Sequence, residues 1–76
     1  MKVTLTLKRV PSIDEISSLH AVLKAIHPDV IETSREDLRI SFAAPTKDVQ
    51  AFGALFFSWL HSPDSIMEGY AMVSDI

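Results

Sequence analysis

The chain contains no cysteine, which excludes disulfide bonds, thiolate metal ligands and cysteine nucleophiles together. It has only two glycines among 76 residues, so a glycine-rich loop that binds phosphate is not expected. No apolar run approaches the ~20 residues of a transmembrane helix, and the N-terminal residues alternate instead of forming the apolar block of a signal peptide. We therefore expect a cytoplasmic protein with no membrane partner, stabilised by side-chain packing.

The chain also lacks a strong excess of charge of either sign. Ten acidic and seven basic residues give a formal net charge of −3, and the two signs are mixed along the sequence. Because a phosphate-binding surface needs clustered lysine and arginine, this composition argues against a nucleic acid as the partner. Hydrophobic residues make up 47% of the chain, which is enough for a folded core. We predict a single domain over residues 1–76.

The residues that are present form a regular succession of hydrophobic patterns. Apolar and polar side chains alternate over residues 3–10, which predicts a strand with one buried face. Ser12 and Glu15 then have the spacing of a capping box, the reciprocal hydrogen bonding that begins many helices. Apolar residues at helical spacing follow, so we predict a helix over residues 13–26.

The second half of the chain repeats this order. Two short extended runs cover residues 30–33 and 38–43, and the polar residues between them suit a hairpin connection. Apolar residues three and four positions apart then predict a second helix over residues 49–60. Thr46 is its expected N-cap, and Asp48 would lie favourably in its first turn.

The last apolar segment, residues 65–73, admits two interpretations. Every second residue from Met67 to Val73 is apolar or glycine, as on the buried side of a strand, whereas Ser65 and Glu68 have the spacing of a capping box for a short third helix. We favour the strand because it completes the order strand, helix, strand, strand, helix, strand. That order is typical of a ferredoxin-like α+β fold, a βαββαβ two-layer sandwich with a four-stranded antiparallel sheet and two helices on one face.

No group of residues has the pattern of a catalytic, cofactor-binding or metal site. His20 and His27 lie two turns apart on the first predicted helix, about 10.5 Å along its axis, which is too far for direct binding of one metal ion. The paired carboxylates fall in a first helical turn and in a hairpin, without the apolar surroundings that would raise a pKa for acid–base chemistry. We therefore predict that the protein is not an enzyme and binds no metal and no cofactor.

The second predicted helix gives the best indication of function. Its apolar arc is wider than one sheet contact requires, because Leu55 and Trp59 widen one side and Phe57 lies beyond the other edge. The helix could pack on both the sheet and the first helix, or Trp59 or Phe57 could remain exposed as an anchor for a partner. Tyr70 is the only aromatic residue expected on the open face of the sheet. The candidate partner-binding residues are Leu55, Phe57, Trp59 and Tyr70.

By elimination, we predict a small non-enzymatic protein–protein interaction module. It would act as a homodimer, or as an adaptor or inhibitor that binds a larger protein complex. Two other classes are open at this point. One is a small-ligand-binding regulatory domain. The other is a nucleic-acid-binding ferredoxin-like domain, which requires Lys8, Arg9, Arg35 and Arg39 to converge in space.

Overall fold

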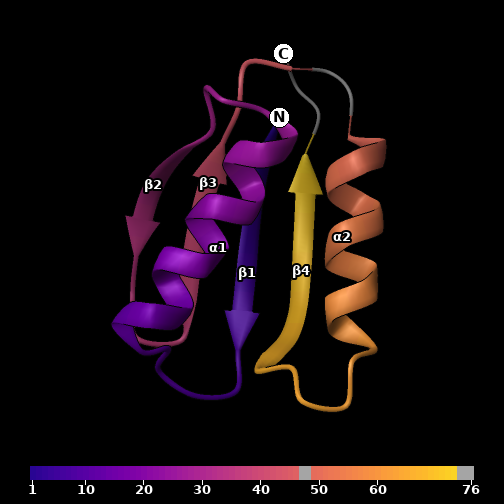
Figure 1. Cartoon of the computed structure of the whole chain (residues 1–76). Helices are drawn as coiled ribbons and strands as arrows, with labels where there is room; N and C mark the ends of the chain where they lie inside the picture. The colour runs from indigo at the N-terminus through magenta and orange to yellow at the C-terminus, as the bar shows by residue number, and fades with distance from the viewer. Residues whose placement is uncertain (47–48, 74–76) are drawn as a thin grey trace.

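The computed structural model describes residues 1–46 and 49–73, and its elements follow the predicted order (Figure 1). The strands form one antiparallel sheet in the order β2-β3-β1-β4. The ferredoxin-like α+β prediction is therefore confirmed, and the last segment is a strand. The elements are β1 (Lys2–Leu7), α1 (Ile13–Ile26), β2 (Ile31–Arg35), β3 (Arg39–Ala43), α2 (Gln50–Leu60) and β4 (Met67–Val73).

The first helix has the predicted bounds because its start is encoded locally. The Ser12 hydroxyl accepts a hydrogen bond from the backbone N–H of Glu15 at 3.2 Å, and the Glu15 carboxylate accepts one from the backbone N–H of Ser12 at 2.9 Å. This reciprocal pair is the predicted capping box. One turn from its C-terminus, α1 places Leu23 in the core with no exposed surface.

The N-cap of the second helix lies three residues after the predicted one, Thr46. Its N-cap is Val49, which has a helical backbone and no capping side chain, and the carbonyl of Val49 accepts the first helical hydrogen bond from Gly53 at 2.8 Å. The prediction of Thr46 as the N-cap is therefore wrong. The backbone N–H of Thr46 instead donates to the carbonyl of Ala44 at 2.8 Å. Asp48, expected in the first turn, lies outside the described residues.

A bulge in β4 changes which of its residues face the helices. The register with β1 shifts one residue after Met67, so an extra residue is inserted on β4 and the alternation of faces is reversed beyond it. Tyr70 and Met72 consequently stand opposite the buried Leu5 and Val3 of β1, on the side of the helices. The prediction that Tyr70 lies on the open face of the sheet, away from the helices, is therefore wrong. The residues of β4 that lie on the open face are Gly69, Ala71 and Val73.

The core lies between the sheet and the two helices. Phe56 of α2 is fully buried, and its ring centroid lies 6.4 Å from that of Phe52, 6.0 Å from Trp59 and 5.6 Å from Tyr70. α1 crosses in front of the centre of the sheet, whereas α2 lies alongside the outer edge of β4 (Figure 1). Within the described residues, no helix has both the length and the apolar character that crossing a bilayer demands.

Candidate functional site: the groove between the helices

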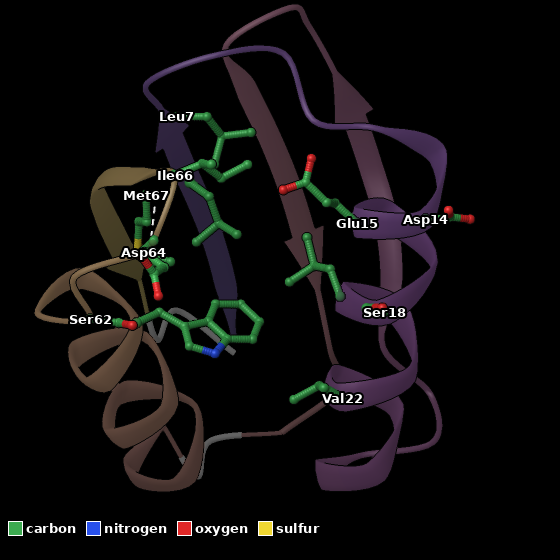
Figure 2. A pocket seen from close by; sticks show the side chains of 13 residues that line it. Leu7, Asp14, Glu15, Ser18, Val22, Ser62, Asp64, Ile66 and Met67 are labelled. Atoms are coloured by element: carbon green, nitrogen blue, oxygen red, sulfur yellow. Dashed lines mark hydrogen bonds between the residues drawn. The ribbon is translucent and has the colours of Figure 1, made fainter.

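A groove of about 410 Å³ separates the first half of α1 from the end of α2 (Figure 2). Its floor is formed by Leu5 and Leu7 of β1, and its walls include Val22 of α1 and Trp59 of α2. Val22 belongs to the predicted buried face of α1, yet it is 37% exposed and lines the groove. The groove therefore leaves apolar surface open to solvent between two helices.

The groove exists because of where the helices lie and how short some side chains are. α2 lies toward the outer edge of β4, and α1 begins on the other side of β1, so the two helices are farthest apart near the end of β1 (Figure 1). On α1, Ser18 and Val22 lie one turn apart on the stripe that lines the groove. Both side chains are short, so they do not reach across to Trp59.

Trp59 connects the groove to the core. Its ring meets that of Phe56 edge-on, at an interplanar angle of 64°, and its side chain is partly buried. The remaining surface of the indole lines the groove. Because the chain has one tryptophan, its fluorescence reports directly on what occupies the groove.

Glu15 brings an ionised carboxylate to the rim of the groove. The Arg9 guanidinium donates to both of its oxygens, at 2.7 and 2.8 Å, and the backbone N–H of Ser12 donates to one of them. The hydrogen bond from Arg9 is the largest cause, and that from the Ser12 backbone the next, of a Glu15 pKa lowered to about 2. Glu15 is therefore negatively charged at all but strongly acidic pH.

Replacing Arg9 by glutamine is expected to raise the Glu15 pKa from about 2 part of the way to the ordinary 4.5, since the bond from Ser12 remains. Because the folded pKa is the lower one, the ionised pair stabilises the fold above about pH 4.5, and this contribution is lost as the pH falls toward 2. NMR titration of the Glu15 carboxyl carbon measures the shift. Arg39→Gln, on the other face of the sheet, is the control, and an unchanged Glu15 pKa in Arg9→Gln would contradict the assignment.

The four predicted partner-binding residues do not form one surface. Trp59 lines the groove, whereas Phe57 lies two residues earlier on a different side of α2 and is 60% exposed. Leu55 is partly buried against the core. Tyr70 is half-buried beneath α2, with its ring against Phe56 rather than on the open face of the sheet. The structure thus divides these residues between a groove, an exposed aromatic side chain and the core.

Sequence reasoning missed the other groove residues. Val22 fits the apolar stripe of α1 and was therefore expected to be covered. Ser18 and Asp64 had no assigned role, because an exposed serine beyond the edge of the apolar stripe of α1 and an aspartate in a loop carry no signal in the sequence. The groove depends on the separation of two helices, which no local pattern encodes.

The basic residues do not gather on one face. Arg35 stands opposite the buried Ile40, on the helix side of the sheet, whereas Arg39 stands opposite Thr6, on the open side. Arg35 also donates two hydrogen bonds to a glutamate of its own strand, at 2.9 and 2.8 Å, and Arg9 is engaged by Glu15. The convergence of free cations that nucleic-acid binding requires is not seen in these positions.

The histidines are used outside the groove. His20 Nε2 lies 3.0 Å from a carboxylate oxygen of Glu32, and the His61 ring packs against Phe57 with the centroids 4.4 Å apart. His27 Nδ1 accepts a hydrogen bond from the backbone N–H of Asp29. Within residues 1–46 and 49–73, no three metal-ligating side chains come together.

Comparisons with protein families, curated proteins and solved structures returned no match to the chain. What the fold and the site define is a class: a small ferredoxin-like α+β protein with an apolar groove between its helices. Because this fold hosts many unrelated functions, its function has to be argued from the groove.

Proposed function

We propose that the chain is a small non-enzymatic protein-interaction module, an adaptor or inhibitor whose groove binds an apolar segment of a larger protein. The observation that supports this most strongly is the apolar groove between α1 and α2, where the wall residues Val22 and Trp59 keep part of their surface exposed to solvent above a floor of buried leucines. Exposed apolar surface with a polar rim is typical of interaction sites, and tryptophan is a frequent anchor in them. The proposal includes the cytoplasmic location expected from the sequence.

The polar residues of the rim suit binding better than catalysis. Three serines line the groove, but no histidine does among the described residues, so no serine–histidine pair is assembled there. Glu15 is held ionised by Arg9 and is therefore a poor general acid near neutral pH. Ser65 is engaged locally, since its hydroxyl accepts a hydrogen bond from the backbone N–H of Met67 at 3.0 Å. Hydrogen bonding to a bound segment is the chemistry that these groups offer.

The test compares the same charge at three exposed positions. Val22→Glu places a carboxylate in the groove, Ala21→Glu places it on the next residue of α1 outside the groove lining, and Phe57→Glu removes the exposed aromatic ring of α2. A partner that co-purifies with the tagged protein is expected to be lost from Val22→Glu, by at least tenfold in affinity, and kept by the other two. The affinities are measured by isothermal titration calorimetry.

Two outcomes would contradict the groove as the binding site. Loss of the partner from Phe57→Glu alone would move the interaction to the outer side of α2. Retention by all three variants would exclude both surfaces. Circular dichroism of each variant confirms that the fold is intact, and sedimentation across a concentration series tells whether the partner is a second copy of the chain.

A small ligand is the second candidate occupant, because the volume of the groove supports it. About 410 Å³ falls within the range of about 300–1,000 Å³ that small-molecule sites occupy. A regulatory domain of this kind would show a rise in melting temperature with one metabolite in the absence of any protein partner. The rise would disappear in Val22→Glu and persist in Ala21→Glu.

A further inference from the structure

The rim of the groove carries charge of one sign. Asp14 and Glu15 come from the first turn of α1, and Asp64 comes from the loop between α2 and β4. The Glu15 and Asp64 side chains point toward the groove from its two sides, whereas that of Asp14 points away on the outer side of α1 (Figure 2). No lysine, arginine or histidine is among the described residues that line it. Acidic residues around an apolar floor favour the binding of positively charged partners over negatively charged ones.

Not all three carboxylates are available to a partner. Glu15 is paired with Arg9 through two hydrogen bonds, so the pair has little net charge. Asp14 and Asp64 take part in no salt bridge within the described residues. The uncompensated negative charge at the groove is therefore that of Asp64, and Asp14 adds to it from farther away, on the outer side of α1 (Figure 2).

We infer that the groove binds a protein segment in which lysine or arginine residues flank apolar ones, an inference that rests on the proposed function. Long basic side chains can lay their methylene stems on apolar walls and keep the charged group at a polar rim. The indole of Trp59 is also the best aromatic partner for a cation. An acidic segment would instead meet Asp64, in a protein whose formal net charge is already −3.

The probes are three synthetic peptides that share one apolar core of leucines and contain no tryptophan. They differ only in their flanking residues, which are lysine, glutamine or glutamate. Binding is followed by the fluorescence of Trp59, the one tryptophan of the chain. At low ionic strength the lysine peptide is expected to bind roughly tenfold more tightly than the glutamate peptide, with the glutamine peptide between them, and the difference should shrink at about 0.5 M salt.

Two double variants with the same change in net charge identify the groups responsible. Asp14→Asn with Asp64→Asn should remove most of the difference between the peptides. Glu36→Gln with Asp37→Asn, in the hairpin between β2 and β3, should leave it intact. A difference that survives the first double variant would overturn the inference.

The peptides also separate failure of this inference from failure of the proposed function. Equal affinity for all three peptides, or tightest binding of the glutamine or glutamate peptide, would overturn the charge preference and leave the groove as a site for apolar segments. If no peptide changes the fluorescence of Trp59, the charge preference and the proposed groove are both wrong.

Discussion

Replacing Phe56 by alanine is expected to lower the free energy of unfolding by about 3–5 kcal/mol, the usual cost of deleting a buried phenylalanine ring. Phe56 has no exposed surface, and its ring lies against the aromatic rings of Phe52, Trp59 and Tyr70. The cavity would open where α2 meets β4. Since small domains are stable by only about 5–15 kcal/mol, the variant should be partly unfolded at mild denaturant concentrations. Urea unfolding followed by far-ultraviolet circular dichroism measures the change.

The matched control is the next residue of the same helix. Phe57 has the same side chain but is 60% exposed, so Phe57→Ala is expected to change the free energy of unfolding by less than about 1 kcal/mol. Equal destabilisation by the two variants would mean that α2 is rotated about its axis relative to the structure. The pair thus tests, independently of any binding partner, which aromatic residues of α2 belong to the core.

Local signals explain which parts of the fold could be predicted. The capping box of Ser12 and Glu15 and the apolar spacing after it depend on residues within one helix, and α1 has the predicted bounds, Ile13–Ile26. The element order needs only the period of each segment, and it too was predictable. The start of α2 was not, because its N-cap, Val49, offers no side-chain hydrogen bond that a sequence pattern could reveal.

Features that depend on pairing between distant segments were not predictable in this way. The bulge in β4 is a property of its register with β1. It turns Tyr70 and Met72 toward the helices, although the apolar residues of β4 still alternate along the sequence as in a strand without a bulge. The groove likewise depends on the position of α2 relative to α1. The width of the apolar arc of α2 did draw attention to Trp59 and Phe57, but it could not tell that Trp59 would line a groove.

The reversed facing of β4 gives the second large expected effect. Tyr70→Asp would place a carboxylate beneath α2 against the ring of Phe56, where few polar groups can solvate it. We expect a loss of about 2–4 kcal/mol in the free energy of unfolding, the range for a poorly solvated, unpaired polar group combined with lost aromatic packing. Urea unfolding followed by circular dichroism measures this loss.

Ala71→Asp is the matched substitution on the neighbouring residue. Ala71 is exposed on the open face, so a carboxylate there remains in water, and only the poor strand propensity of aspartate is expected to cost about 1 kcal/mol or less. Uninterrupted alternation from Met67 would place Ala71 inward and Tyr70 outward and would reverse the order of the two effects. The sign of the difference between Tyr70→Asp and Ala71→Asp therefore decides whether the bulge is present. If Ala71→Asp lowers the free energy of unfolding more than Tyr70→Asp does, Ala71 faces the helices, as the sequence alternation alone suggests. The position of Tyr70 beneath α2 would then be wrong.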